Sequence, residues 1–354
     1  MIPLFKPYMP SLPEADHVLY SGQLNAGAYT RQFEDALKAY FGTELVLVTN
    51  TFGMAISLAT HALQMCYGDE IIASPMACLV SLQPYLTSGL RVKWADVDPK
   101  RGTLDPASVR AAITPRTKAI VHNHFCGYPG YIDEINSIGR EYGIPVIDDC
   151  IEAFGSLSKG NKIGNCGTDV TVFSLGAVRI PNTIDGGVVI FKNKEKYEKA
   201  KLIRDCGINR SVFRDDIGEI SPDCDICDQG FCATLSNFNA YIGVEQMKVA
   251  QDLIDRQRDQ AQIWNRYFSS DRDYLPVSVS DGAPNYWVYG VLTQKKSKRE
   301  AILEFREKGF YASGVHINNN IYSVFGDQRE LPGVKDFYSG FLALPCGWWM
   351  NDGK

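Results

Sequence analysis

Three short segments carry residue types whose spacing suits chemistry, and the first is Asn50-Thr51-Phe52-Gly53. It follows the apolar run LVLVT (residues 45–49) and opens a helical pattern over residues 53–65. Backbone N–H groups at a helix amino terminus, with a hydroxyl and a glycine beside them, suit a phosphate group. Taken alone, the segment is explained more simply as an ordinary N-cap.

The second segment is the pair Asp148-Asp149, which ends the run IPVIDD. A carboxylate at the end of a buried strand can keep the ring nitrogen of a bound cofactor protonated. A helix cap or a metal ligand would use the same residue type, so the pair is weak evidence alone. No His or Cys constellation accompanies it at metal-ligand spacing, and we predict no metal site.

The third segment follows the run TDVTVF, which ends at Ser174. The Ser174 hydroxyl suits a second phosphate contact. Arg179 lies in the loop that follows, and Asp185-Gly186-Gly187 predicts a tight turn before the next strand. None of the three segments is decisive by itself.

The elements that must position these segments alternate between helix-like and strand-like patterns. Helical periodicity marks residues 30–41, 53–65, 133–142 and 246–267, and short apolar runs predict strands at 45–49, 71–73, 92–94, 119–122, 145–147, 170–173 and 187–191. Apolar strands separated by helices indicate an α/β protein with a largely parallel sheet covered on both faces. Ligands bind at the carboxyl ends of such strands, where the three segments fall.

Composition excludes several classes of protein. The 354 residues are 45% hydrophobic and 22% charged, as in a folded globular chain. A net charge of −5 argues against a nucleic-acid partner. The uncharged stretch 71–90 contains Pro75 and Pro84, which favours a buried strand and its loop over a membrane span. Without a recognisable signal peptide, ten dilute cysteines are expected as reduced thiols, so we predict a cytoplasmic protein.

Together and in this order, the segments resemble the DegT/DnrJ/EryC1/StrS family of sugar aminotransferases. The resemblance covers nearly the whole chain, from IPLFKPYMP through VKWADVDP (92–99) and VIDDCIEAFG (146–155) to Leu344-Pro345. It implies the type I PLP-transferase fold, in which a large domain contains a mostly parallel mixed sheet. We predict this PLP-binding domain over residues 1–255 and a smaller C-terminal α+β domain over 256–354.

The resemblance also implies roles for individual residues. Asp149 would pair with the ring nitrogen of pyridoxal phosphate (PLP) or pyridoxamine phosphate (PMP), and His316 lies where the family has a His near the sugar. Glu152 stands where the family usually has Gln near the ring, and Cys78 where it has a stacking aromatic residue. The expected phosphate contacts are Thr51, Phe52, Gly53 and Ser174. Family members form homodimers with shared active sites, and the partner's phosphate-binding Asn aligns with Cys232.

The chain departs from the family at its catalytic Lys, which falls six residues before the acidic residue of the turn. That position is Arg179, and no Lys occurs between Lys162 and Lys192. The family's Lys bonds covalently to PLP and moves a proton, whereas an Arg guanidinium stays protonated. Three explanations are open: an engineered substitution, a natural enzyme that uses pre-formed PMP, or a degenerate binding protein.

Cys224, Cys227 and Cys232 form a CxxC with a third thiol nearby. Zinc or iron–sulfur binding would need a fourth ligand, and we predict a metal-free loop.

The resulting prediction is a PLP-dependent aminotransferase. It would move an amino group from glutamate to a nucleotide-linked keto-sugar in polysaccharide or glycoconjugate biosynthesis, with Arg179 at the Lys position. The alternatives are a PMP-dependent nucleotide-sugar dehydratase and a catalytically degenerate binding homologue. Neither nucleic acid nor a membrane is an expected partner.

Overall fold

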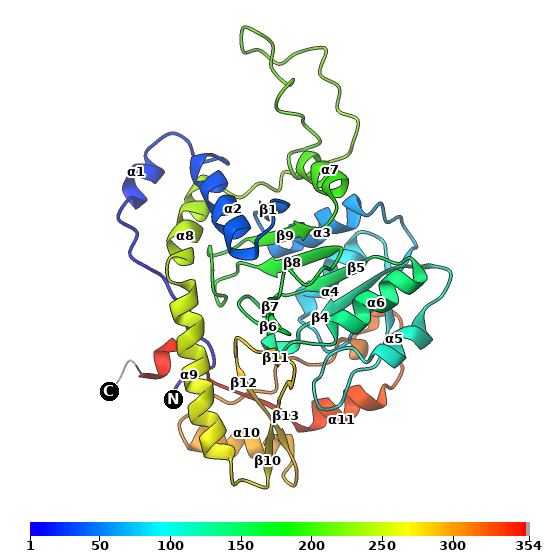
Figure 1. The fold of residues 1–354 in the computed structure, drawn as a ribbon, viewed down its shortest axis with the longest axis vertical. Helices are drawn as coiled ribbons and strands as arrows, with labels where there is room; N and C mark the ends of the chain where they lie inside the picture. Colours follow the sequence, from blue (N-terminus) through cyan, green and yellow to red (C-terminus); the bar gives the residue numbers. More distant parts are fainter. Residues whose placement is uncertain (352–354) are drawn as a thin grey trace.

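The computed structural model describes residues 1–351, and its centre is a seven-stranded sheet with the order β1-β9-β8-β5-β4-β2-β3 (Figure 1). The strands are β1 (Val46–Thr49), β2 (Glu70–Ala73), β3 (Arg91–Trp94), β4 (Thr117–Asn123), β5 (Val146–Asp149), β8 (Val170–Ser174) and β9 (Gly187–Phe191). Neighbours from β3 to β8 pair in parallel, while β9 runs antiparallel to both β8 and β1. This mostly parallel mixed sheet confirms the predicted α/β class.

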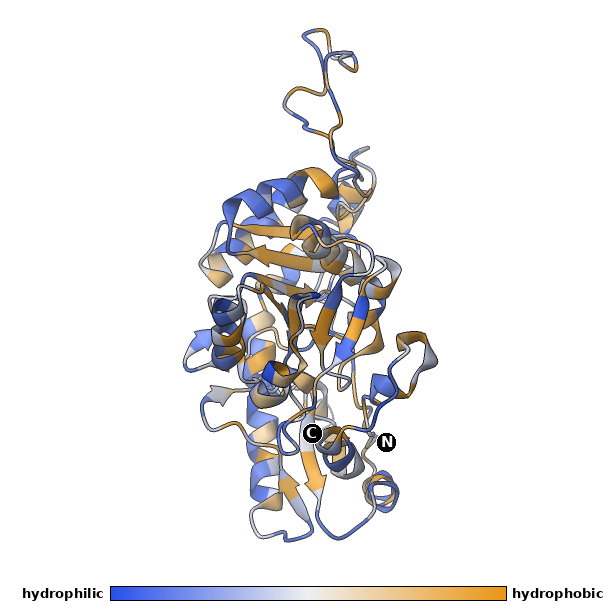
Figure 2. Cartoon of the chain, turned by 90° about the vertical axis from the view of Figure 1, so that its right-hand side faces the viewer, coloured by the Kyte–Doolittle hydropathy of each residue, from blue (hydrophilic) through white to orange (hydrophobic). Residues whose placement is uncertain are grey.

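The strands form where the apolar runs predict them, because their side chains are buried on both faces of the sheet. Every residue of β1, β5 and β9 is buried. Figure 2 shows strands of mostly hydrophobic residues beside helices that mix hydrophilic and hydrophobic residues. Alternate side chains point to opposite faces, so Asp149 and Asp148 at the end of β5 enter different layers.

Helices cover both faces of the sheet. One face packs against α3 (Phe52–Ala62), α4 (Leu79–Thr87) and α7 (Lys194–Arg204). The other packs against α2 (Ala28–Phe41) and α8 (Asn237–Met247) on the β1 side, and against α5 (Pro106–Ala112) and α6 (Ile132–Tyr142) on the β2 side. Small buried residues of α3, including Ala55, Ala59 and Ala62, let this helix lie close to the strands.

The uncharged stretch 71–90 differs from its prediction in its second half. Its beginning forms the buried strand β2, as predicted, but residues 79–87 form the helix α4 with Pro84 inside it. Pro84 is tolerated because it lies in the second turn of a short helix, where few main-chain hydrogen bonds are lost. No helix within residues 1–351 combines the length and the apolar character needed to cross a membrane.

The C-terminal part begins on the long helix α9 (Ala250–Phe268), which runs down one side of the molecule (Figure 1). Beyond it, β10 (Tyr274–Pro276), β12 (Tyr289–Thr293) and β13 (Phe341–Leu344) form an antiparallel sheet beside α10 (Lys298–Glu307) and α11 (Pro332–Gly340). The predicted domain boundary at 255/256 falls inside α9 and stays a prediction. The remaining short elements are α1 (Ala15–Leu19), β6 (Leu157–Ser158), β7 (Asn161–Lys162), β11 (Gly282–Ala283) and 3₁₀ turns at Phe125–Gly127, Asn319–Ile321, Ser323–Phe325 and Trp348–Asn351.

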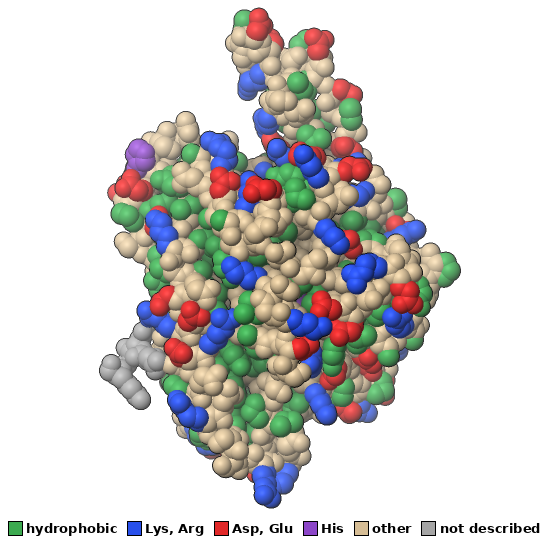
Figure 3. Space-filling model, in the orientation of Figure 1, with side chains coloured by type: hydrophobic (Ala, Val, Ile, Leu, Met, Phe, Trp, Pro, Cys, Tyr) green, Lys and Arg blue, Asp and Glu red, His purple; other side chains and the backbone are tan. Residues whose placement is uncertain are grey.

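A long loop between α7 and α8 projects from the body and is visible in both the ribbon and the space-filling view (Figures 1 and 3). We call residues 207–230 the arm. Its two ends meet at Gly207 and Gly230, where a Cβ on Gly230 would lie 2.3 Å from the Gly207 nitrogen. Glycine is therefore required for the two chains to approach this closely.

Candidate active site

Thr51 and Ser174 reach the same edge of the sheet because of the strand register. Ser174 pairs with Gly187 across β8 and β9, and Gly187 pairs with Thr49 across β9 and β1. The ends of β1 and β8 are thus separated by one intervening strand, or about 10 Å. The intervening residue must be small, since a Cβ on Gly187 would lie 2.8 Å from both Thr49 Oγ1 and the Thr51 carbonyl oxygen.

The expected phosphate cradle lies where β1 meets α3. Thr51 is the N-cap of α3, and its Oγ1 accepts a hydrogen bond from the Met54 N–H at 3.2 Å. Phe52 and Gly53 form the first turn, which presents main-chain N–H groups at the amino end of the helix. Ser174 Oγ accepts from the Gly176 N–H at 3.1 Å and keeps its own hydrogen for another partner. The arrangement suits an anion.

Asp149 is a buried carboxylate at the end of β5, only 2% exposed. Its Oδ1 accepts the Ile151 N–H at 3.1 Å, but no cation pairs with it among residues 1–351. Burial raises the pKa of Asp149 to about 6. The neighbouring Tyr85 hydroxyl and Asn123 Oδ1 are also buried, and these two atoms have no hydrogen-bond partner among the described residues. A protonated ring nitrogen is the kind of group that would satisfy this carboxylate.

Glu152 lies at the centre of a second group of polar side chains. Its Oε1 lies 2.7 Å from His316 Nε2 and 3.7 Å from Arg179 Nη2, and its Oε2 accepts the Cys126 N–H at 2.8 Å. Burial opposes ionisation of Glu152, but His316, Arg179 and the Cys126 N–H together lower its pKa below the usual value. Glu152 is therefore a carboxylate with polar partners, among them the Arg179 cation, unlike Asp149.

Arg179 points into the molecule rather than into solvent. Its side chain is 10% exposed, and its guanidinium lies 4.5 Å over the Trp287 ring. Arg179 Nε and Nη1 are buried with no hydrogen-bond partner. A space of about 10 Å³ remains beside Glu152, Ser174 and Arg179, which is roughly the room of one water molecule. The side chain at the expected Lys position thus nearly fills its pocket.

Cys78 is the N-cap residue of α4 and is partly buried. Burial, with a contribution from the Glu152 charge, raises the pKa of its thiol to about 11. The thiol is therefore protonated at neutral pH and faces the Glu152 side of the site. The Cys78 side chain has no ring that could stack on a cofactor. Its contact with the cofactor stays a prediction.

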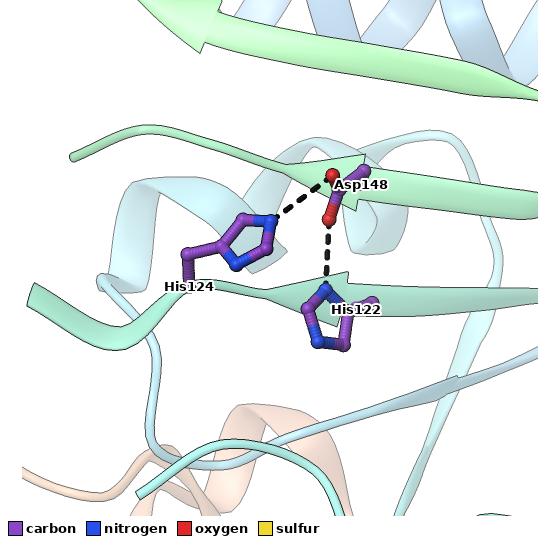
Figure 4. A group of neighbouring side chains, drawn as sticks. All are labelled: His122, His124 and Asp148. Atoms are coloured by element: carbon purple, nitrogen blue, oxygen red, sulfur yellow. Dashed lines mark hydrogen bonds and ion pairs between the residues drawn. The ribbon is translucent and has the colours of Figure 1, made fainter. Parts of the chain in front are cut away.

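His122, His124 and Asp148 form a fully buried cluster at the ends of β4 and β5 (Figure 4). His122 Nδ1 lies 2.8 Å from Asp148 Oδ1, and His124 Nε2 lies 3.1 Å from Asp148 Oδ2. The Gly130 N–H donates to His124 Nδ1 at 3.0 Å, which requires His124 to carry its hydrogen on Nε2. The two His side chains outweigh burial and hold the pKa of Asp148 below its usual range. His122 Nε2 is buried and has no hydrogen-bond partner in the described part of the chain. The three side chains have metal-ligand spacing, so two histidines do accompany Asp148, contrary to the sequence analysis, and the absence of a metal site stays a prediction.

Within residues 1–351, the side chains of the arm cysteines do not come together as a set of metal ligands. The group with metal-ligand spacing there consists of His122, His124 and Asp148. Cys224 and Cys227 lie along the arm, while Cys232 pairs with Asp205 beside its base. That the arm binds no metal stays a prediction.

Trp287 is a site residue that the sequence analysis missed. Its ring lies under Arg179, parallel to His316 at 6.1 Å and against Phe5 at 4.3 Å. It comes from the C-terminal part of the chain, far in sequence from the three segments. No local spacing marks it, since only the fold brings residue 287 to residue 179.

Comparisons with known proteins identify the family and agree with this fold. A family model described as the DegT/DnrJ/EryC1/StrS aminotransferase family matches residues 10–354. The uncharacterized protein MJ1066 of Methanocaldococcus jannaschii is 27% identical, covering 99% of this chain and 94% of the relative. The spore coat polysaccharide biosynthesis protein SpsC of Bacillus subtilis is 27% identical, covering 96% of this chain and 90% of the relative.

Solved structures of other proteins share the fold, and two of them illustrate the similarity. Sugar aminotransferase CalS13 from Micromonospora echinospora has a TM-score of 0.90 at 27% identity, covering 99% of this chain and 95% of that one. AtS13 from Actinomadura melliaura has a TM-score of 0.89 at 29% identity, covering 99% and 94%. The predicted fold class is confirmed.

Proposed function

The chain belongs to the DegT/DnrJ/EryC1/StrS aminotransferase family, and from that premise we propose that it is a PLP-dependent sugar aminotransferase. It moves an amino group from glutamate to a nucleotide-linked keto-sugar in polysaccharide or glycoconjugate biosynthesis. It works in the cytoplasm as a homodimer with shared active sites. The names of CalS13 and SpsC, a sugar aminotransferase and a coat-polysaccharide protein, support this substrate class.

The observation that carries the proposal is the uncompensated carboxylate of Asp149. It lies on the sheet face shared with Thr51 and Ser174, at the same edge. When bound there, PLP supplies an electron sink that makes the substrate's α-hydrogen acidic. Asp149 holds the proton on the ring nitrogen, and the α3 amino terminus with Ser174 binds the phosphate.

Arg179 changes how the cofactor is held. A guanidinium is neither a nucleophile nor a proton acceptor near neutral pH, so PLP binds without a covalent bond at this position. Arg179 instead contributes charge, since its Nη2 lies 3.7 Å from the Glu152 carboxylate. The proton that the family's Lys would carry must be moved by another group.

Non-covalent binding also favours a second candidate, the PMP-dependent nucleotide-sugar dehydratase. Such an enzyme takes PMP already formed and has no need of a covalent bond to the protein. The two differ in their use of glutamate, because only the aminotransferase converts it to 2-oxoglutarate.

The test follows 2-oxoglutarate and the cofactor absorbance while the protein is incubated with PLP and glutamate. The aminotransferase predicts PMP and 2-oxoglutarate in equal amounts, faster in Arg179→Lys than in the parent. Arg140→Lys, a change at an exposed arginine, serves as the matched control and should behave as the parent. PMP binding without 2-oxoglutarate favours the dehydratase, and no binding of either cofactor contradicts both enzymes in favour of a binding homologue.

A further inference from the structure

The missing lysine leaves the site without its usual proton carrier, and one pair of side chains stands where a replacement is needed. We infer that His316 is the proton-transfer residue of this site and that Glu152 is the positioning residue that holds it. This inference rests on the proposed function. The two side chains are in direct contact, with His316 Nε2 2.7 Å from Glu152 Oε1.

The contact with Glu152 fixes which nitrogen of His316 is free. Glu152 is ionised, and a carboxylate only accepts hydrogen bonds, so His316 Nε2 must carry the hydrogen in the neutral ring. Its Nδ1 then has a lone pair. No hydrogen bond to Nδ1 is formed within residues 1–351, and the side chain is 21% exposed. A free basic nitrogen on an accessible, oriented ring is what a general base requires.

Packing holds the His316 ring in place. The ring lies nearly parallel to Trp287, at 6.1 Å and 11°, and edge-on to Phe125 at 6.2 Å. Trp287 also contacts the Arg179 guanidinium on the same side of the site. His316 is thereby fixed beside the position from which the family's Lys would act.

Arg179 and Glu152 both differ from the residues that the family usually has at these positions. Their opposite charges lie 3.7 Å apart and support each other. Burial opposes ionisation of Glu152, but His316, the Arg179 cation and the Cys126 N–H together lower its pKa and keep it ionised, which prevents Glu152 from taking the proton itself. An ionised Glu152 also stabilises the imidazolium that forms when His316 gains a proton. A glutamine at 152, as in the family, would accept the Nε2 hydrogen but would supply no charge to this imidazolium.

Other titratable groups around the site are poorer candidates. Burial raises the pKa of the Cys78 thiol to about 11 and that of Cys126 well above its usual value, so both hold their protons. Asp149 is committed to the ring nitrogen, and Arg179 is always protonated. His316 is the group that remains.

PLP, when bound, would take the substrate's amino nitrogen by condensation at its aldehyde, releasing one water that is taken up again when 2-oxoglutarate is released. His316 Nδ1 would accept the proton from the substrate's α-carbon, whose electron pair the cofactor would hold, and would return that proton to the carbon of the former aldehyde. No further reactant is needed. Glu152 keeps the Nε2 hydrogen throughout.

The first test uses the cofactor-free protein and needs no activity. Long-range ¹H–¹⁵N NMR of ¹⁵N-histidine protein, with His316→Asn for assignment, reports which ring nitrogen carries hydrogen. We expect His316 in the Nε2–H form at neutral pH, and Glu152→Gln should make this preference weaker. A His316 ring with its hydrogen on Nδ1 would overturn the inference.

The second test measures exchange of the glutamate α-hydrogen in D₂O with PLP present, alongside PLP affinity from absorbance titration. We expect His316→Asn to slow exchange by about 100-fold, in the range of general-base effects, with PLP affinity unchanged and partial rescue by added imidazole. Glu152→Gln should slow exchange less. His17→Asn, at an exposed histidine in α1, is the control and should exchange at the parent rate.

The outcomes distinguish a failure of the His316 role from a failure of the proposed function. If the parent binds PLP but His316→Asn exchanges at the parent rate, the proton-transfer role is wrong and the proposed function stands. If the parent binds neither PLP nor PMP, the proposed function fails and the inference falls with it.

Discussion

The carboxylate of Asp149 should destabilise the cofactor-free protein, and replacing it with Asn should relieve that cost. Burial raises the pKa of Asp149 to about 6 from its ordinary value of 3.8, so the folded state binds this proton more tightly than the unfolded chain does. Stability is therefore lost as the pH rises from about 4 to 6 and stays lost above. At about 1.4 kcal/mol per pKa unit, the loss approaches 3 kcal/mol at pH 7.

Urea denaturation of the cofactor-free parent and of Asp149→Asn measures this directly. Asn keeps an oxygen for the Ile151 N–H that Asp149 Oδ1 accepts. The two proteins should be about equally stable at pH 4, and the variant should be more stable by about 2–3 kcal/mol at pH 7. Added PLP should stabilise the parent more than the variant. A difference that does not change between pH 4 and pH 7 would refute the reasoning.

Three further changes test other parts of the site. Thr51→Ala should lower the free energy of unfolding by about 1 kcal/mol and weaken PLP binding. Asn193→Ala, at the N-cap of α7, should lower it by the same amount and leave PLP affinity unchanged. Equal losses of PLP affinity in the two variants would contradict a phosphate-binding role for Thr51. His124→Leu should cost about 3 kcal/mol in urea denaturation by leaving buried Asp148 half paired, and this cost should shrink in acid as Asp148 is protonated; a change below about 1 kcal/mol would contradict the cluster's role. Gly187→Ala should lower PLP affinity in absorbance titrations, because its Cβ would meet the Thr51 carbonyl oxygen; unchanged affinity would show that the cradle tolerates the shift.

The sequence predicted the sheet well because its strands are buried on both faces. Runs such as GVVIF, which forms β9, are apolar throughout and have no other stable place than the middle of a sheet. The stretch 79–87 was harder, because Pro84 within an uncharged segment suggests a loop. Packing of Leu82 and Tyr85 into the core settles it as helix.

The candidate site was predictable only where its residues follow strands directly. Thr51, Asp149 and Ser174 each lie at or just beyond a strand's carboxyl end, so their meeting follows from the sheet. Trp287 comes from the C-terminal part of the chain and meets Arg179 through tertiary packing alone. The contact between Glu152 and His316 spans 164 residues, and no periodicity in the sequence encodes it.

The central claim is that this pocket binds PLP without a covalent bond, because Arg179 stands at the lysine position. Borohydride reduction of the PLP-loaded protein, followed by intact and peptide mass spectrometry, tests it most directly. We expect the parent to bind PLP yet gain no mass in its pocket, while Arg179→Lys gains one reduced PLP at position 179. A stoichiometric adduct on another lysine of the parent, or a parent that binds no PLP, would contradict it.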